Sequence, residues 1–200
     1  MFYLDLYPND PPGFHAISTS SQWEAWINCV LPAEISSEVK RRLRSNLKHI
    51  LVGLEMKAGL ILPHGKRVSG KSVLFEPYFQ NLNFEFCVGV FSVCEGLGTV
   101  SHLVLSGDDG SSGARVPPSR WIPALCNAFD PREEHGLKEN VDAVKQVRDK
   151  MHQDRLGLRA DIDWHSFGYA AAFRPGHEAI QTLLKQCAEK VPAETNLLPD

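Results

Sequence analysis

The sequence predicts an all-α fold, a helical bundle with an irregular N-terminal arm. Apolar residues recur every three or four positions through several long segments, which is the spacing that gives a helix one apolar face. Hydrophobic residues make up 43% of the 200 residues and charged residues 22%, enough for one sizeable core in a single domain. The segments do not alternate between strand and helix patterns, as a parallel sheet flanked by helices would require.

The first third of the chain is expected to hold the arm, a short helix and a long helix. STSSQWEAWINCVL opens with Ser and Thr residues that suit a helix N-terminus, and it places Trp23, Trp26 and Val30 on one face. Pro32 ends this short helix. A long helix should follow from Ala33 and close at Pro63. Its apolar stripe is Val39, Leu43, Leu47, Ile50, Leu51, Leu54 and Ala58.

The segment 73–105 fits two patterns. NLNFEFCVGV alternates like a strand, whereas the apolar residues of the whole segment recur at helical spacing. Strands rarely reach this length, so a helix is the better prediction. Glu85 and Glu95 interrupt its apolar run, so we expect a buried element and no membrane span.

The last third of the chain is expected to be helical on both sides of a loop. A short helix is predicted at 119–129, and Asp130-Pro131 predicts the start of a longer one that continues through VKQVRDKMHQDRL. Residues 157–175 should form a loop or short turn, followed by a last helix at roughly 175–190.

These predicted elements divide the chain into three parts. Residues 1–32 are the arm and its short helix, residues 33–191 are the helical bundle domain, and residues 192–200 are a flexible tail.

Charge and cysteine content restrict the class of protein. The net charge is −3, which does not suggest a protein that coats nucleic acid without sequence preference. The charge is uneven, however, because residues 36–72 hold nine Lys or Arg and only two acidic residues. The five cysteines are scattered without C-x-x-C and are expected to be buried reduced thiols. The N-terminus lacks the basic start of a signal peptide. A cytoplasmic location is therefore predicted.

The stretch HGKRVSGKS fits the phosphate-binding loop G-x-x-x-x-G-K-[ST] at residues 65–72. In a nucleotide-binding protein this loop follows a buried strand and opens a helix at its lysine. Here the residues before it continue an amphipathic helix, and Pro77 falls early in the next one. A basic loop between two helices is the favoured interpretation, and a P-loop nucleotide-binding protein is the alternative.

A second motif, VKQVRDKMHQDRL, carries a stronger chemical pattern. Arg148 and His152 are four residues apart, so a helix brings them to one face. Histidine moves protons near neutral pH, and arginine binds a phosphate through two parallel N–H groups. The pair could cleave RNA without metal, with His152 as general acid and base. An ordinary exposed helix end with surface ion pairs is the alternative.

At these residues the sequence resembles the HEPN superfamily, small helical domains that are often metal-independent ribonucleases or their inactive relatives. VKQVRDKMHQDRL resembles the Arg–polar–x–His signature, FEPYFQNLNFEFCVGVFSVCEGL the long helix, and FRPGHEAIQTLLKQC the closing helix. The resemblance covers roughly residues 33–190. It implies a helical bundle, a homodimer that joins two signatures at one cleft, and single-stranded RNA as substrate.

The resemblance assigns roles to particular residues. Arg148, His152 and Asp149 take the catalytic positions, and four basic residues are predicted to contact the substrate phosphates. Those four are Lys150, Arg155, Arg44 and Lys48. Only three residues separate Arg148 from His152, where the family has four to six, and Asp149 replaces the common Asn. A non-catalytic helical module for dimerisation or for binding a partner protein is therefore the second hypothesis.

A metal site is not predicted. Glu134, His135, Asp161, Asp163 and His165 are suitable ligand types, but no H-E-x-x-H or similar spacing joins them. No cofactor is predicted either.

Overall fold

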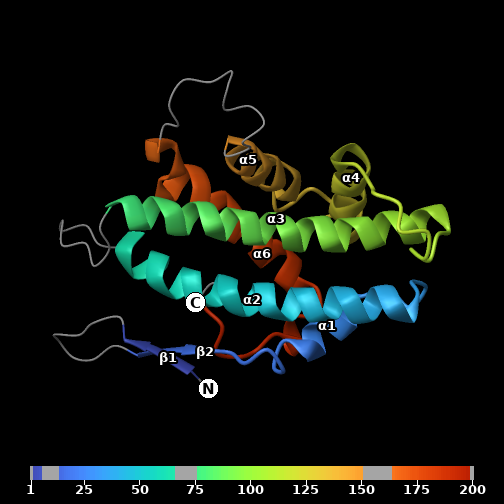
Figure 1. The fold of residues 1–200 in the computed structure, drawn as a ribbon, viewed down its shortest axis with the longest axis horizontal. Coiled ribbons are helices and arrows are strands. Elements are labelled where there is room, and N and C mark those ends of the chain that lie inside the picture. The colour runs from blue at the N-terminus through green and yellow to red at the C-terminus, as the bar shows by residue number, and fades with distance from the viewer. Residues whose placement is uncertain (1, 6–13, 66–75, 151–163, 199–200) are drawn as a thin grey trace.

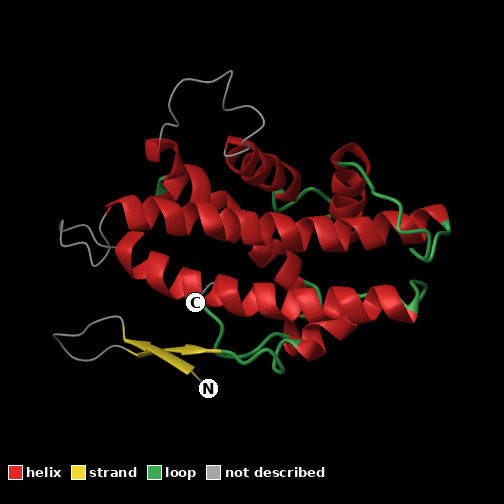
Figure 2. Cartoon of the chain, in the orientation of Figure 1, coloured by secondary structure: helices red, strands yellow, loops and turns green. Residues whose placement is uncertain are grey.

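A computed structural model describes residues 2–5, 14–65, 76–150 and 164–198 (Figure 1). Its helices are α1 (Glu24–Val30), α2 (Ser37–Gly65), α3 (Glu76–Ser106), α4 (Pro118–Phe129), α5 (Leu137–Lys150) and α6 (Arg174–Lys185). Figure 2 shows that helix dominates the fold, which confirms the all-α prediction. In the described residues the sheet is limited to a hairpin, in which β1 (Phe2–Asp5) pairs antiparallel with β2 (Phe14–Ile17).

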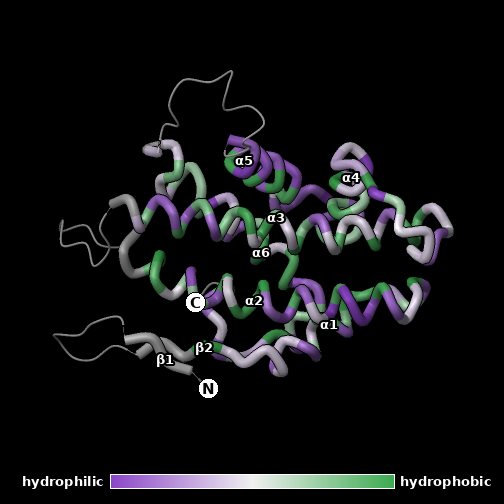
Figure 3. Tube along the Cα trace, viewed as in Figure 1, coloured by the Kyte–Doolittle hydropathy of each residue, from purple (hydrophilic) through white to green (hydrophobic). Residues whose placement is uncertain are grey.

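The helices pack around α3, which crosses the middle of the molecule. Helix α2 lies along one side of α3, and α4 and α5 lie on the other side (Figure 1). Helix α6 packs against both α5 and α3. Figure 3 shows hydrophilic and hydrophobic residues interleaved along α2 and α5, as expected for helices with one face on a core. The predicted apolar stripes therefore form one continuous core.

Helix α3 is the apolar centre of this core. Phe86, Val90 and Val93 are fully buried on it. Among the described residues, Tyr78–Ser106 is also the one helix whose length and composition would allow it to cross a membrane. Buried core helices pass the same test, and α3 contacts four other helices of the bundle.

A glycine allows α3 to approach α4 closely. A Cβ atom on Gly98 would lie 2.7 Å from both the backbone oxygen and the ring of Trp121, which is too close for any side chain. Trp121 is fully buried at this contact. Gly98 is therefore required by the packing of the two helices.

The N-terminal and C-terminal segments are both attached to the bundle. Trp23 and Trp26 are fully buried, so α1 belongs to the core. The prediction of a flexible tail at 192–200 is corrected for residues 192–198, which the structure describes. Leu197 is fully buried, and the side-chain amide of Asn196 donates to the backbone oxygen of Glu55 at 2.9 Å.

The predicted helix start at Pro131 is wrong. The Asp130 carboxylate accepts hydrogen bonds from the backbone N–H groups of Glu134, His135 and Leu137. Gly136 has a φ of +60°, which a right-handed helix cannot contain. Asp130 and Gly136 thus form a turn, and α5 begins only at Leu137.

The long helix predicted from Ala33 to Pro63 runs from Ser37 to Gly65, and boundaries near the C-terminus also move. The last helix ends at Lys185, because Gln186 is extended and Cys187 adopts a left-handed φ of +56° before the short 3₁₀ helix η4 (Ala188–Lys190). The segment expected to be a loop contains the 3₁₀ helix η2 (Trp164–Phe167) and the π-helical turn η3 (Tyr169–Phe173). Their Phe167 and Phe173 are fully buried, and this apolar anchoring explains the order.

Candidate functional site

The predicted phosphate-binding arginine lies in the last turn of α5. The guanidinium carbon of Arg148 lies 4.9 Å from the centre of the Phe91 ring on α3, a cation–π contact. Its Nη1 donates to Oδ1 of Asp149 at 2.9 Å, and the side chain is 32% exposed. Asp149 is its one hydrogen-bond partner within the described ranges. Arg148 is therefore held in place by one ring contact and one ion pair among the described residues.

Asp149 is engaged by two cations. Besides Arg148, the Nζ of Lys145 donates to its Oδ2 at 2.5 Å. Burial alone would raise the pKa of Asp149, but the hydrogen bonds from Lys145 and Arg148 outweigh burial and lower the pKa below its usual value. Asp149 is thus a carboxylate at neutral pH and can position Arg148, but it has no proton to donate.

Part of the predicted site falls outside the described residues. His152 and Arg155 lie in 151–163, so the geometry of the Arg148–His152 pair stays a prediction. Lys150 is described as the last residue of α5, where a positive charge complements the helix dipole. Most of the phosphate-loop pattern, residues 66–72, lies outside too. Helix α2 runs directly into it up to Gly65, so a helix stands where a P-loop requires a strand.

The other predicted substrate contacts lie on α2. Arg44 lines a small pocket between the end of α1 and the start of α2, which we call the basic pocket. Its lining residues are Asn28, Leu31, Ser37, Lys40, Arg41 and Arg44. Lys48 lies one turn further along and forms an ion pair with Glu24 of α1 at 3.1 Å, so its charge is already compensated.

The predicted basic residues do not form one surface. Helix α3 lies between α5, which carries Arg148, and α2, which carries Arg44 (Figure 1). An RNA strand that touched both residues would have to pass around the bundle. The structure thus separates a candidate catalytic end of α5 from a candidate phosphate-binding start of α2.

A larger groove between α2 and α3 was not predicted from the sequence. It has a volume of about 690 Å³, and its lining includes His49, Ser92 and Glu95 together with several apolar side chains. Ser92, Gly96 and Thr99 line the groove and recur at spacings of four and three on α3, and this small-residue pattern could have indicated the groove. Nothing among the described residues identifies an occupant.

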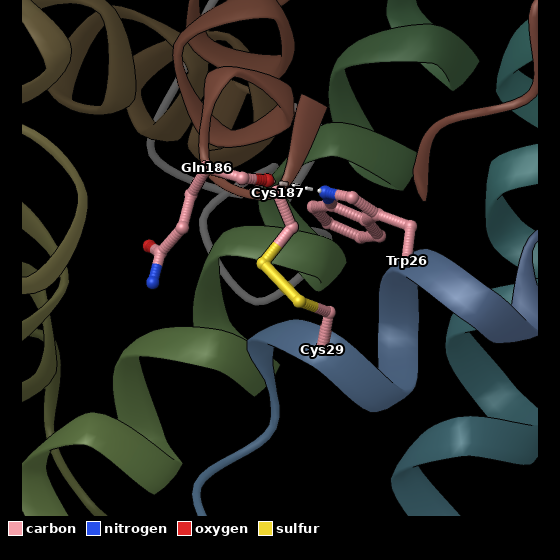
Figure 4. Close-up of a disulfide and its surroundings, with 4 residues drawn as sticks. All are labelled: Trp26, Cys29, Gln186 and Cys187. Carbon is pink, nitrogen blue, oxygen red and sulfur yellow. Dashed lines mark hydrogen bonds between the residues drawn. A yellow bond between two sulfur atoms is a disulfide. The ribbon is translucent and has the colours of Figure 1, made fainter. Parts of the chain in front are cut away.

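A disulfide joins Cys29 on α1 to Cys187, and Figure 4 shows the bond beside Trp26. The indole N–H of Trp26 donates to the backbone oxygen of Gln186 at 2.9 Å in the same corner. The prediction of reduced thiols is therefore wrong for this pair, because the fold brings two residues 158 positions apart into contact. Disulfides persist mainly in oxidising compartments, whereas the cytoplasm keeps thiols reduced. The cytoplasmic location stays a prediction.

The remaining cysteines are free. Burial raises the pKa of Cys87 and of Cys94 to about 12, which keeps both thiols protonated and unreactive. Burial, followed by the nearby Asp130 carboxylate, raises the pKa of Cys126 to about 11. The prediction of buried, reduced thiols is confirmed for Cys87 and Cys94.

One group of potential metal ligands occurs among the described side chains. It consists of Cys29, Cys187 and Glu189, whose ligand atoms lie within 4.8 Å of one another. In the disulfide form neither sulfur is a thiolate, which is the form that binds metal. The side chains of Asp161, Asp163 and His165 lie outside the described residues.

The chain matches no protein-family model, no curated protein and no solved structure. The resemblance to the HEPN superfamily therefore stays a prediction, carried by the sequence stretches quoted above.

Proposed function

We propose that this chain is a HEPN-like, RNA-directed protein that cleaves single-stranded RNA without a metal ion. The observation that supports this is the fixed guanidinium of Arg148, held by Phe91 and Asp149 four residues before His152. In the proposed reaction the 2′-oxygen attacks the phosphorus and the bond to the 5′-oxygen breaks. His152 removes the 2′-OH proton and returns a proton to the leaving oxygen, while Arg148 stabilises the anionic phosphorus centre.

The second candidate is a non-catalytic RNA-binding or protein-binding module with the same fold. The Arg148–Asp149 ion pair favours this candidate, because a carboxylate beside the arginine repels an incoming phosphate. The short spacing between Arg148 and His152 favours it as well.

Two further properties belong to the proposal. The resemblance implies a homodimer in which two copies bring their signatures together, and the mass of the protein in solution tests this. A cytoplasmic location requires Cys29 and Cys187 to be largely reduced in cells. Trapping the thiols in intact cells before lysis measures that fraction.

The decisive experiment is RNA cleavage in EDTA. Single-stranded RNA of mixed sequence is incubated with wild type, His152→Ala and Arg148→Ala. Arg132→Ala is the matched control, because the Arg132 side chain is 83% exposed and its one ion pair with a described residue is to Glu134 at 3.8 Å. We expect cleavage by wild type and Arg132→Ala, and loss of cleavage in the other two variants.

Two other outcomes of the cleavage assay would change the proposal. Cleavage that survives His152→Ala would remove His152 as the general acid and base. Absence of cleavage by wild type, with RNA binding intact, would favour the non-catalytic module.

A further inference from the structure

The basic pocket concentrates positive charge in a way that favours an anionic ligand. Its volume is about 350 Å³, and Lys40, Arg41 and Arg44 line it without any acidic residue. We propose that this pocket binds a backbone phosphate of single-stranded RNA. The inference rests on the RNA-directed function proposed above and assigns the phosphate contact to one place on the molecule.

The hydrogen bonds of the three cations support this assignment. Lys40 donates to the backbone oxygen of Ala33 at 2.9 Å, and Arg44 reaches the side-chain oxygen of Asn28 only at 3.5 Å. Arg41 makes no hydrogen bond or ion pair with a described residue. None of these partners carries a negative charge, so no ion pair with a described residue offsets the mutual repulsion of three cations on one helix end.

The neighbouring cations on α2 show the contrast. Arg42 forms an ion pair with Glu38, and Lys48 forms one with Glu24. Glu38 and Glu24 thus compensate two cations next to the pocket, whereas the cations inside it form no ion pair with a described residue. An external anion is the partner that the pocket lacks.

The chemistry of the lining fits a phosphodiester. A guanidinium presents parallel N–H groups that match two phosphate oxygens, and both Arg41 and Arg44 carry one. Asn28 and Ser37 add neutral hydrogen-bonding groups, while Leu31 offers an apolar wall for a sugar. The pocket also lies at the start of the 29-residue helix α2, whose dipole favours an anion there.

Binding and cleavage can be measured separately. A fluorescently labelled 2′-deoxy single strand cannot be cleaved by 2′-OH attack and reports phosphate contacts by anisotropy across a salt series. The RNA strand of the same sequence reports cleavage. The variants are Arg41→Ala with Arg44→Ala as a double change, and Arg42→Ala as the control. The control removes the same kind of charge from the same helix, but Arg42 faces the α2–α3 groove.

We expect the double variant to weaken binding about tenfold. The slope of log affinity against log salt should become shallower by about 0.7 for each phosphate that the protein no longer binds. The control should bind within about twofold of wild type. Equal affinity of the double variant and wild type, or equal weakening by Arg42→Ala, would overturn the inference.

The same data separate this inference from the proposed cleavage. If the wild type binds without cleaving RNA and the double variant binds more weakly, the pocket is upheld and the ribonuclease is rejected. Unchanged binding by the double variant, with cleavage that depends on His152, would reject the pocket and uphold the ribonuclease. A wild type that binds neither strand would reject both. Far-ultraviolet circular dichroism of each variant checks that the fold is intact.

Discussion

The two halves of α2 treat ionisable side chains in opposite ways. In the C-terminal half, Glu55 is fully buried, and its carboxyl group accepts hydrogen bonds from the backbone N–H and hydroxyl of Ser18 at 3.0 and 2.8 Å. The indole N–H of Trp23 adds a longer contact at 3.4 Å. In the N-terminal half, Arg41 and Arg44 are cations that line a pocket without any acidic residue.

This contrast shows that burial decides the role of a polar group. A buried carboxyl group must find donors inside the protein, so Glu55 connects α2 to the end of β2 and to α1. An exposed arginine keeps water as a partner, so it can remain uncompensated until a ligand arrives. Glu55 is accordingly a structural residue, and the basic pocket is a candidate for function.

The strongest test of this contrast is Glu55→Ala. The change leaves the donors of Ser18 without their acceptor and opens a cavity, so we expect a loss of about 2–4 kcal/mol in the free energy of unfolding. Urea denaturation followed by tryptophan fluorescence measures it. Glu55→Gln fills the same volume and should cost less. A Glu55→Ala protein as stable as wild type would end the structural interpretation.

A smaller effect is expected at the end of α5, where a carboxylate does compensate two cations. Asp149→Asn should reduce stability at neutral pH by about 0.5–1 kcal/mol, because Lys145 and Arg148 lose their partner. Since the folded state lowers the pKa of Asp149, this stabilisation is fully present above the usual value of 3.8 and is lost as the pH falls through the lowered pKa.

Denaturation curves of wild type and Asp149→Asn at several pH values check this prediction. The two stabilities should differ by a constant amount near neutral pH and converge in the acid range. A difference that persists below the lowered pKa would show that Asp149 stabilises the fold by some means other than its charge.

The smallest effect on stability is expected in the basic pocket. Arg41→Ala should change the free energy of unfolding by less than about 0.5 kcal/mol, because Arg41 has no described partner to lose. At low salt the change should be slightly stabilising, since it relieves repulsion from Lys40 and Arg44, and added salt should remove the difference. A clear loss of stability would mean that Arg41 is structural, like Glu55.

The fold was predictable where the apolar period was long. Helices α2 and α3 run over 29 and 31 residues, and their stripes leave little choice of structure. The start of α5 was not predictable, because Asp130-Pro131 is also a good helix start by local rules. The turn is set by the Asp130 carboxylate together with the left-handed Gly136.

The candidate site was predictable only in part. Helical geometry places Arg41 and Arg44 on one face, and the structure gathers both in one pocket. The ion pair of Lys48 depends on Glu24 of another helix, which no local pattern reveals. The placement of Phe91 under Arg148 likewise depends on how α5 crosses α3. Local sequence thus identifies basic faces, whereas tertiary contacts decide which of them remain open.

The Cys29–Cys187 bond closes most of the polypeptide into a covalent ring, since the two residues are 158 positions apart. A protease that cuts one peptide bond between them therefore opens the ring without releasing a fragment. The nicked protein would keep its full mass on a non-reducing gel and separate into pieces only after a reductant is added. Limited proteolysis of this protein has to be read on both kinds of gel, because either one alone would misreport where the chain is accessible.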